Sequence, residues 1–507
     1  VDIPVWKSEN CIQCNRCAYV CPHAVIRPVA LTEEEVAQAP EGLKTLDMIG
    51  MPGMKFTMTV SAYDCTGCGS CVNVCPGKKN KETGEVEKAL TMANMEANAG
   101  EQTFFDFGRE IPVKPEVVAK FKETTVKGSQ FKQPLLEFSG ACAGCGETPY
   151  AKLITQLFGD RMYIANATGC SSIWGNSSPS TPYTVTPEGK GPAWSNSLFE
   201  DNAEFGYGML LAQNTIRDRL KAKVEKIAEK TTDEAVKAAA AEYLETYTVG
   251  ATNGTATDKL VAALEALDCD CEERAEVLKN KDFLAKKSQW IFGGDGWAYD
   301  IGYGGVDHVL ASKKDINIMV FDTEVYSNTG GQSSKATKTG ATAQFAAGGK
   351  ETKKKDLAGM AMTYGYVYVA QIAMGADFNQ TVKAIAEAEA YPGPSLIIAY
   401  APCINHGIKK GMSKAQTEEQ LAVECGYWNN FRYNPAAEGD KFSLDSKAPK
   451  AEGYQDFLNG EVRYNALKRA NPAKADKLFA LNEQEAMERY DYLNKLVTVY
   501  AAEKEDK

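Results

Sequence analysis

The sequence predicts an α/β protein in which a doubly wound, mostly parallel sheet is preceded by a small α+β domain. After about residue 140, short apolar runs alternate with helical stretches, which is typical of such a sheet. Two similar cysteine runs near the N-terminus indicate a small domain held together largely by metal. At 507 residues the chain is too long for one ordinary core, so we expect two or three domains.

The composition argues against several classes of protein. Hydrophobic residues make up 44% of the chain, yet no uninterrupted apolar run approaches the length of a membrane span. The formal net charge of -11 argues against a nucleic-acid partner and favours small, soluble partners. Residues 1–6 do not resemble a secretory signal, and without an initiator Met we expect a processed chain or a piece of a longer one. We therefore expect a cytoplasmic protein without membrane contacts.

The cysteines are spaced for metal binding rather than for disulfides. Eight lie in two runs of the form C-x2-C-x2-C-x3-C-P, which begin at Cys11 and Cys65. In such a run, three thiolates of a tight loop bind one 4Fe-4S cluster, and the fourth, on a short helix, reaches the other cluster. Zinc is the weaker alternative, because zinc ribbons use cysteine pairs. The spacing assigns one cluster to Cys11, Cys14, Cys17 and Cys75 and the other to Cys65, Cys68, Cys71 and Cys21.

The domain boundaries follow from composition and periodicity. A strand at 54–60 leads into the second cysteine run, and a proline-rich stretch of low periodicity at about 103–136 reads as a connector. Amphipathic helices with solvated Lys and Glu residues form an insertion at about 209–287. The predicted domains are 1–115 for the two-cluster domain, 116–141 for the connector, 142–434 for the larger domain and 435–507 for a helical tail.

Apolar runs in the larger domain predict the strands of the doubly wound sheet. These runs, which follow a helix at 149–158, lie at 162–168, 289–292, 316–322, 366–372 and 395–400. Ligands of such sheets bind at the carboxyl ends of the strands. Just past four predicted strand ends lie Cys170, Asp295, Thr323 and Cys403. One rim of one sheet should therefore carry these oxygen ligands and thiols together.

A glycine turn with one carboxylate, Gly293-Gly294-Asp295-Gly296, follows the second of these runs. A magnesium diphosphate needs oxygen ligands, near-octahedral geometry and close backbone approach. Asp295 can supply the carboxylate, the flanking glycines the close approach, and Thr323 a further oxygen; an ordinary turn is the alternative. Since 26 residues separate Gly296 from Thr323, the stretch resembles the thiamine diphosphate signature, although Thr323 stands where that signature has its first Asn.

A third cluster would need a fourth ligand besides Cys142, Cys145 and Cys170. Cys403 is the preferred candidate because it ends a strand of the same sheet as Cys170. Cys425 and the pair Cys269/Cys271 are the alternatives, but Cys425 follows a polar helix at 414–423.

For the remaining cysteines and for most of the histidines we expect no role in metal binding or catalysis. We expect Cys269 and Cys271, which lie in an acidic helical stretch, to be incidental surface thiols. His23, His308 and His406 are the only histidines, so histidine acid-base catalysis is a weak hypothesis. His406 is the one we retain, because it lies beside Cys403.

The order of these motifs resembles the C-terminal part of pyruvate:ferredoxin oxidoreductase, with its two-cluster ferredoxin-like domain and its thiamine diphosphate-binding fold. The resemblance rests on the two cysteine runs, Cys142-x2-Cys145, Gly169-Cys-Ser171, Gly294-Asp-Gly-Trp-Ala298 and Asp322-Thr-Glu-Val-Tyr-Ser-Asn-Thr-Gly-Gly-Gln332. It covers nearly the whole chain; the helical insertion and the tail after about residue 435 lack usable motifs.

The resemblance implies three 4Fe-4S clusters, thiamine diphosphate and Mg2+ as cofactors. It implies magnesium binding by Asp295, Thr323 and the Val325 carbonyl, and completion of the third cluster by Cys403. The catalytic residue near the reacting carbon would be Asn328. The implied contacts with thiamine diphosphate are Glu147, Cys170, Gly294, Asp295, Gly296, Trp297, Thr323, Glu324, Val325, Tyr326, Ser327 and Asn328.

The implied activity is oxidative decarboxylation of pyruvate with coenzyme A to acetyl-CoA and carbon dioxide, with single electrons passing through three clusters to ferredoxin or flavodoxin. We find no dinucleotide fingerprint for hydride transfer. In the family, the glutamate that activates the aminopyrimidine, the coenzyme A contacts and much of the substrate pocket lie upstream. We therefore expect this chain to be inactive alone, to pack against an upstream pyrimidine-binding segment or subunit, and to work in a homodimer of the full assembly.

Three alternatives remain. The substrate could be another 2-oxo acid, such as 2-oxoglutarate or an aryl pyruvate. The chain could instead be an electron-transfer subunit in which the Gly-Asp-Gly turn is purely structural. A non-oxidative thiamine decarboxylase is the third alternative, against which the many cluster-spaced thiols argue.

Overall fold

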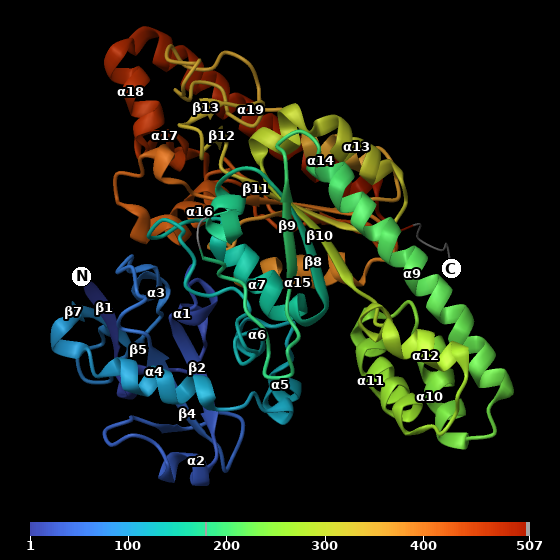
Figure 1. Cartoon of the computed structure of the whole chain (residues 1–507). Coiled ribbons are helices and arrows are strands. Elements are labelled where there is room, and N and C mark those ends of the chain that lie inside the picture. The colour runs from blue at the N-terminus through green and yellow to red at the C-terminus, as the bar shows by residue number, and fades with distance from the viewer. Residues whose placement is uncertain (178–179, 503–507) are drawn as a thin grey trace, which may run out of the picture.

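The computed structural model describes residues 1–177 and 180–502. The N-terminal domain contains two antiparallel strand pairs and one three-stranded antiparallel sheet, and each cysteine run includes a short helix (Figure 1). The predicted strand at 54–60 and the α+β character are confirmed. The elements are β1 (Asp2–Trp6), α1 (Arg16–Tyr19), β2 (Ile26–Leu31), α2 (Glu33–Ala37), β3 (Leu46–Asp47), β4 (Lys55–Val60), α3 (Ser70–Val74), β5 (Lys78–Lys79), β6 (Val86–Glu87) and β7 (Leu90–Asn94).

The stretch interpreted as a connector is partly helical. It contains α4 (Glu101–Glu110), α5 (Pro115–Phe121) and α6 (Val126–Ser129). Pro115 begins α5 rather than interrupting it, because the first turn of a helix tolerates a residue without an N–H group. α4 buries Phe105 and packs on β4. The prolines therefore mark helix ends here, and the exact domain boundary remains a prediction.

An eight-stranded sheet forms the centre of the larger domain. Its order is β17-β16-β14-β15-β11-β10-β8-β9; the six strands from β14 to β9 are parallel, and β16 and β17 are antiparallel additions at one edge. This confirms the predicted mostly parallel sheet. The bounds are β8 (Met162–Ala167), β9 (Ala193–Ser197), β10 (Ser288–Gly294), β11 (Asn317–Asp322), β14 (Tyr368–Ile372), β15 (Ser395–Tyr400), β16 (Phe431–Tyr433) and β17 (Phe442–Leu444).

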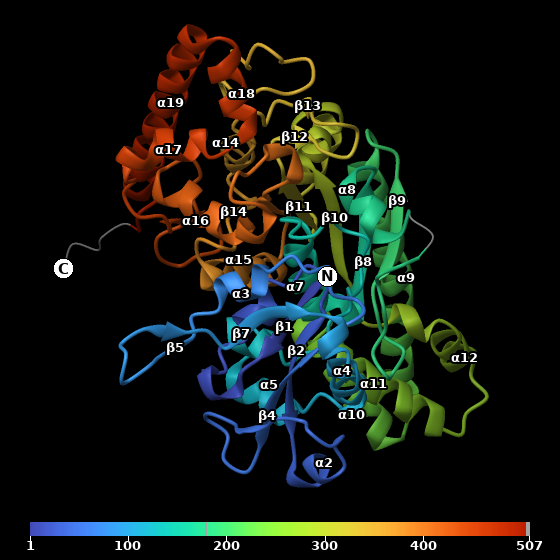
Figure 2. The ribbon, with the colours of Figure 1, turned by 90° about the vertical axis from the view of Figure 1, so that its left-hand side faces the viewer.

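Helices cover both faces of this sheet (Figures 1 and 2). Because side chains alternate along a strand, Ile291 and Ile318 enter one apolar core while Phe292 and Met319 enter the other. The second core is closed by α7 (Thr148–Phe158) and α15 (Phe378–Ala390). The first is closed by α13 (Tyr303–Ala311), α14 (Leu357–Met362), α17 (Tyr454–Asn459), α18 (Val462–Ala470) and α19 (Pro472–Val499).

Helices occupy the stretch predicted as an insertion, and they form a lobe with its own core (Figure 1, green to yellow). Its helices are α9 (Asn202–Lys230), α10 (Glu234–Glu245), α11 (Gly250–Ala266) and α12 (Glu272–Lys279). The core of the lobe gathers Leu220, Tyr243 and Leu260, all fully buried. α9 starts before the predicted insertion and connects the lobe to the sheet, since its N-terminal turns pack on β8 and β10.

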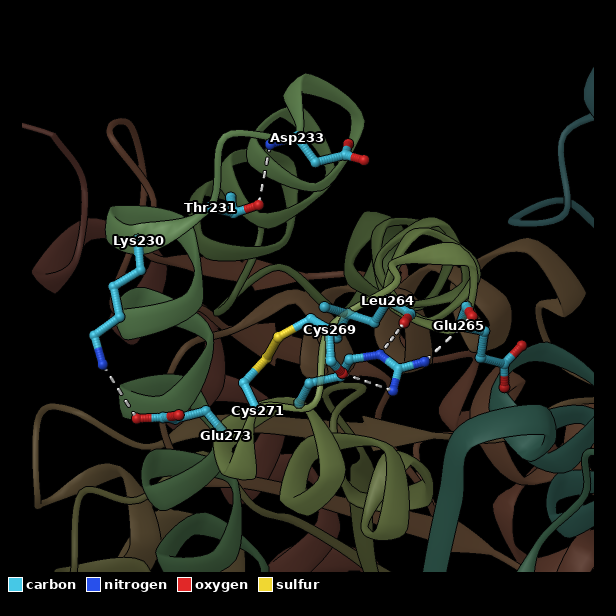
Figure 3. Close-up of a disulfide and its surroundings, with 9 residues drawn as sticks. Lys230, Thr231, Asp233, Leu264, Glu265, Cys269, Cys271 and Glu273 are labelled. Carbon is cyan, nitrogen blue, oxygen red and sulfur yellow. Dashed lines mark hydrogen bonds and ion pairs between the residues drawn. A yellow bond between two sulfur atoms is a disulfide. The ribbon is translucent and has the colours of Figure 1, made fainter.

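Cys269 and Cys271 form a disulfide between α11 and α12, which corrects the expectation of two incidental thiols (Figure 3). Their Cα atoms are 5.5 Å apart, within the usual range for a disulfide. Arg274 donates to the carbonyl groups of Leu264 and Cys269 beside the bond. The spacing of Cys269 and Cys271, with one residue between them, does not predict this disulfide, because the sequence does not show the backbone turn that brings the two sulfur atoms together.

The C-terminal tail is helical, as expected, and it also completes the sheet. β17 lies beyond the predicted boundary at residue 434, so this boundary cuts between two paired strands. α19 is long, as is α9, yet no helix in the described ranges combines the length and apolar character that a membrane span needs.

The two-cluster domain contacts the larger domain through polar groups near its short helices. Tyr19 on α1 donates its hydroxyl to the Phe378 carbonyl at 3.0 Å. Asn73 on α3 donates its amide to the Ser413 carbonyl at 2.6 Å. Both helices carry cysteines of the two runs, so the contacts hold the cluster-spaced thiols against the larger domain.

A buried carboxyl group should make the stability of this fold depend on pH. Glu419, on α16 (Ala415–Glu424), accepts the Gly375 N–H at 2.6 Å, and burial raises its pKa to about 8 from 4.5. The folded chain therefore keeps a proton that the unfolded chain releases, so the free energy of unfolding should fall as pH rises from about 4.5 to about 8. Between pH 5 and 7 we expect a loss of about 1 kcal/mol per pH unit.

Urea denaturation at several pH values would measure this dependence. A Glu419→Gln variant should lose this part of the slope, because its amide does not titrate. Glu424 lies exposed on the same helix, and Glu424→Gln should leave the slope unchanged. A Glu419→Gln variant with the full wild-type slope would contradict the assignment.

Candidate functional site

The eight cysteines of the two runs gather into two sets of four. Cys11, Cys14, Cys17 and Cys75 line one cavity, together with apolar side chains such as Trp6 and Met58. Cys21, Cys65, Cys68 and Cys71 line a second cavity. Each set thus combines three cysteines of one run with the last cysteine of the other, which is the combination the spacing assigns.

The two cysteine loops have matching backbone geometry. The Gln13 N–H donates to Cys11 Sγ and the Gly67 N–H donates to Cys65 Sγ, each at 3.4 Å. Gln13 and Gly67 both have positive φ, 56° and 70°, which turns these N–H groups back toward the sulfur atoms. N–H donors stabilise a thiolate, so both loops are built to present sulfur in its metal-binding form.

Without a bound cluster, burial favours the neutral thiol form of these cysteines over the charged thiolate. It raises the pKa of Cys65 to about 12 and also raises the pKa of Cys17 and Cys71 well above its ordinary value. A bound iron cluster reverses this, since a coordinating thiol is deprotonated. In residues 1–177 and 180–502, no three His, Cys, Asp or Glu side chains are gathered closely enough to hold a single metal ion.

A third set of thiols comes together where the loop at 142–146 meets the segment after β15. The Gly146 N–H donates to the Pro402 carbonyl at 3.1 Å. A Cβ at Gly146 would lie 2.5 Å from the Pro402 nitrogen, so glycine permits this close approach. The contact brings Cys142 and Cys145 to Cys403.

Electrostatic coupling places Cys170 in the same group. Burial and the nearby Glu147 raise the pKa of Cys170, and Cys403 and Cys145 raise it further. Burial raises the pKa of Cys403 to about 11, with contributions from Glu147 and Cys142. The alternative ligand, Cys425, is buried elsewhere and donates its thiol to the Ala422 carbonyl at 3.6 Å. The structure therefore gathers Cys403, and not Cys425, with the other three.

The rim of the sheet holds three oxygens at distances that suit a metal ion. β8, β10, β11 and β15 run parallel, so the residues that follow them meet at one edge. There Asp295 Oδ1 lies 3.0 Å from Thr323 Oγ1, which lies 3.0 Å from the Val325 carbonyl oxygen. Adjacent oxygens of an octahedral magnesium site with bonds of 2.0–2.1 Å are about 2.9 Å apart. The three groups fit neighbouring positions of such a site.

Asp295 is fully buried, and no cation within residues 1–177 and 180–502 forms an ion pair with it. Its other oxygen accepts the Ser334 hydroxyl at 2.5 Å. Burial and the nearby Asp322 raise the pKa of Asp295 well above its ordinary value. A divalent cation would favour the ionised carboxylate and offset this cost.

Glycines let aromatic side chains pack on the turn. A Cβ at Gly293 would lie 2.3 Å from the Trp297 ring, and one at Gly296 would lie 2.6 Å from the Tyr326 ring. At Gly294 the nearest atom to such a Cβ is 3.8 Å away, so no close contact there requires glycine.

Glu324 differs from the other residues proposed for the cofactor, because its side chain points away from the rim into a buried ion-pair network. Its carboxylate lies 3.1 Å from Lys354 Nζ and 3.0 Å from the Arg463 guanidinium, and Tyr427 donates to it at 2.5 Å. The backbone of Glu324 is left-handed, with φ of 61°. The side chain of Glu324 therefore holds the turn, and the predicted contact between Glu324 and a cofactor stays a prediction for its backbone.

His406 connects the rim to the third thiol set. Burial, assisted by Arg463, lowers the pKa of His406 to about 3, so its ring is neutral. Nε2 lies 2.6 Å from the Thr323 carbonyl and donates to it, which leaves Nδ1 to accept the Cys403 N–H at 3.4 Å. The ring therefore links Thr323 to Cys403 as a structural support. His23 contacts the Ser139 carbonyl and His308 packs beside Tyr207, both outside the rim.

The remaining predicted residues lie around the open side of the rim. Cys170 Sγ is 3.1 Å from Ser327 Oγ, so the thiol set and the segment after β11 touch directly. Asn328 follows and is exposed. Glu147 is buried and accepts the Trp174 indole N–H at 3.0 Å, and burial raises its pKa to about 7.

Comparison with known proteins agrees with both parts of this arrangement. Residues 10–79 match the family model of the 4Fe-4S dicluster domain, and residues 277–399 match that of the thiamine pyrophosphate enzyme, C-terminal TPP binding domain. These matches confirm a domain of the iron-sulfur dicluster type and one of the thiamine diphosphate-binding type.

Relatives of known name match nearly the whole chain. It is 56% identical to the pyruvate:ferredoxin oxidoreductase of Moorella thermoacetica and 53% identical to the pyruvate-flavodoxin oxidoreductase of Enterobacter agglomerans, in each case over 98% of this chain and 42% of the relative. It is 48% identical to the mitochondrial pyruvate dehydrogenase [NADP(+)] of Euglena gracilis, over 94% of this chain and 26% of that protein. The resemblance deduced from the motifs is confirmed, and the chain spans less than half the length of these relatives.

Proposed function

We propose that this chain is the thiamine diphosphate- and cluster-binding part of a pyruvate:ferredoxin oxidoreductase. The complete enzyme would convert pyruvate and coenzyme A to acetyl-CoA and carbon dioxide and pass single electrons through three 4Fe-4S clusters to ferredoxin or flavodoxin. One observation carries the proposal: Cys170, of the third thiol set, lies 3.1 Å from Ser327, in the segment that follows the oxygen ligands. An electron acceptor and a diphosphate site would thus share one rim.

Asp295, Thr323 and the Val325 carbonyl would hold Mg2+, and the ion would hold the diphosphate. Their spacing of 3.0 Å supports this, as does the buried charge of Asp295. When bound, thiamine diphosphate supplies the electron sink that decarboxylation of a 2-oxo acid requires. The aromatic rings of Trp297 and Tyr326, packed on the glycine turn, would exclude water from the buried side of the site.

Residues at the open side would handle the substrate. The exposed Asn328 amide can donate to a carboxylate or a carbonyl of a 2-oxo acid, which would orient it. Glu147, whose pKa is raised to about 7 by burial, can hold or release a proton near neutral pH. Its place among the thiols of the third set puts that proton beside the electron acceptor.

The thiol sets are arranged for stepwise electron transfer. Burial and the nearby Cys21 raise the pKa of Cys68, whereas the nearby Gly144 backbone lowers it. Because Gly144 lies between Cys142 and Cys145, the loop of the third set lies next to the set of Cys21, Cys65, Cys68 and Cys71. We infer that electrons leave the rim through that set and reach the carrier through the set of Cys11, Cys14, Cys17 and Cys75.

The proposed enzyme needs groups from outside this chain. Thiamine enzymes activate the aminopyrimidine with a glutamate from a partner domain. The chain covers 42% of the length of its Moorella thermoacetica and Enterobacter agglomerans relatives. We propose that an upstream segment or subunit supplies this group with the coenzyme A contacts, and that the full assembly is a homodimer. Full turnover by the chain alone would refute this part.

The deciding experiment is anaerobic reduction of a viologen dye by the complete assembly, with pyruvate or 2-oxoglutarate, each with and without coenzyme A. We expect strong reduction with pyruvate that depends on coenzyme A. Reduction with 2-oxoglutarate alone would reassign the substrate. If an iron-replete assembly reduced the dye with neither acid and contained no thiamine diphosphate, the chain would be an electron-transfer subunit.

A cysteine substitution should test the third cluster. Cys403→Ser should remove about four iron atoms per chain and leave the two ferredoxin-type clusters, because each 4Fe-4S cluster depends on four thiolates. Iron analysis with low-temperature electron paramagnetic resonance would show this. Cys425→Ser is the matched control and should retain all iron; iron loss in the control, and none in Cys403→Ser, would reverse the assignment.

A further inference from the structure

A buried lysine joins the two-cluster domain to the helix that leaves the third thiol set. Lys152 lies on α7, which begins three residues after Cys145, and its side chain is only 1% exposed. Its ammonium donates to the Ala18 carbonyl on α1 and, at 3.0 Å, to Gln130 Oε1. Both acceptors are uncharged, and no carboxylate of the described residues forms an ion pair with Lys152.

An ammonium buried in this way is costly unless a negative charge lies nearby. Burial lowers the pKa of Lys152 to about 8, and Cys21 and Cys17 are the anionic groups that oppose this change. Ala18 lies between these two cysteines on the chain, one from each set of four. The negative charge that faces Lys152 therefore belongs to the sulfur ligands of the two ferredoxin-type sites.

We infer that Lys152 is a potential-setting residue: its fixed positive charge favours the reduced form of the ferredoxin-type clusters, foremost the one that includes Cys21. The inference rests on the two clusters of the proposed function. A cluster gains one negative charge on reduction, and a neighbouring cation in a medium of low dielectric constant stabilises that charge. The cation would thus draw the electron from the third cluster toward the two-cluster domain.

The position of the hydrogen bonds adds a structural role. α7 connects the loop of Cys145 to the carbonyl of Ala18, so Lys152 also sets the separation between the third thiol set and α1. The two roles make different predictions: a neutral side chain that still donates a hydrogen bond would preserve the spacing but not the charge.

The test is a reduction titration of the clusters, followed by electron paramagnetic resonance, on the complete assembly in the absence of pyruvate. Lys152→Gln, which keeps a donor, and Lys152→Met, which does not, should each make reduction of a ferredoxin-type cluster at least about tenfold less favourable. For a one-electron couple this is a shift of about 59 mV to lower potential. Lys152→Arg, which keeps the charge, should stay close to the wild-type potential.

Lys132 provides the matched control. Its ammonium donates to the Leu157 carbonyl at the end of α7 and pairs with Glu123, away from the cysteines. Lys132→Met should leave all potentials unchanged. Wild-type potentials in Lys152→Gln or Lys152→Met with full iron content would overturn the inference, as would an equal shift in Lys132→Met. Absence of the clusters from the wild-type protein would instead refute the proposed function.

Discussion

An Asp295→Asn variant should lose more than about 100-fold in pyruvate-dependent dye reduction while it keeps its iron. Asp295 supplies the only carboxylate of the three rim oxygens, and an amide oxygen carries no charge to hold a divalent cation. Substitution of residues one shell outside a metal site costs about 10–100-fold, so loss of a direct ligand should cost more. Mass spectrometry of the desalted assembly should find little magnesium and little thiamine diphosphate.

The same variant should not destabilise the cofactor-free chain. Burial and Asp322 raise the pKa of Asp295, so its charge opposes folding in the absence of a cation, and the neutral amide removes that cost. Asp307→Asn on α13 is the control: Asp307 accepts the Tyr364 hydroxyl at 2.7 Å, away from the rim, and the variant should keep activity and cofactor. Wild-type cofactor content in Asp295→Asn would remove Asp295 from the magnesium site.

The strands and the thiol sets of the two runs could be predicted because their signals are local. A buried parallel strand is a continuous apolar run, as at Trp290 and Ile318, and the order of such runs with helices defines the sheet. In a cysteine run, the spacing itself decides which thiols can face one cluster. The rim followed from these strands, because residues after parallel strands meet at one edge.

Contacts between distant segments could not be predicted in this way. Glu324 lies in a segment that resembles the thiamine diphosphate signature, but its ion-pair partners Lys354 and Arg463 lie 30 and 139 residues further along the chain. The contact of Gly146 with Pro402 also joins distant segments, and it brings the loop of Cys142 to Cys403. Glycine at position 146 was the available signal, yet glycines are common in turns.

Arg463 should be the most costly residue to remove from the buried network. Its guanidinium lies 3.0 Å from Glu324 and 2.6 Å from Glu461, and all three side chains are buried. Among the residues that the structure describes, Arg463→Met would leave Glu461 without an ion-pair partner of fixed positive charge and would leave Glu324 paired with Lys354. Removal of one partner from a buried ion pair costs about 3–5 kcal/mol, and we expect a loss of this size in the free energy of unfolding, measured with urea.

The substitution Arg463→Met should first loosen the turn at Glu324, on the rim of the sheet. The Glu324 N–H donates to Asp322 at 3.1 Å, and the left-handed backbone at Glu324 depends on the side chain being held in place. Hydrogen exchange at the Glu324 amide should therefore accelerate in Arg463→Met, and the affinity for magnesium diphosphate should fall with it. A variant that exchanges as slowly as wild type would show that the turn does not depend on the network.

Two further variants separate the cost of a buried charge from the loss of packing. The double variant Glu461→Gln, Arg463→Met should be more stable than Arg463→Met, because it also removes the Glu461 carboxylate, which Arg463→Met leaves without its cation. Arg489 lies on the surface of α19 and forms an ion pair with the partly exposed Asp356. Arg489→Met removes this pair and should lower the free energy of unfolding by less than about 1 kcal/mol. Equal losses in the free energy of unfolding for Arg489→Met and Arg463→Met would contradict this prediction. The buried network would then stabilise the fold no more than a surface ion pair does, and the sheet alone would hold the turn at Glu324.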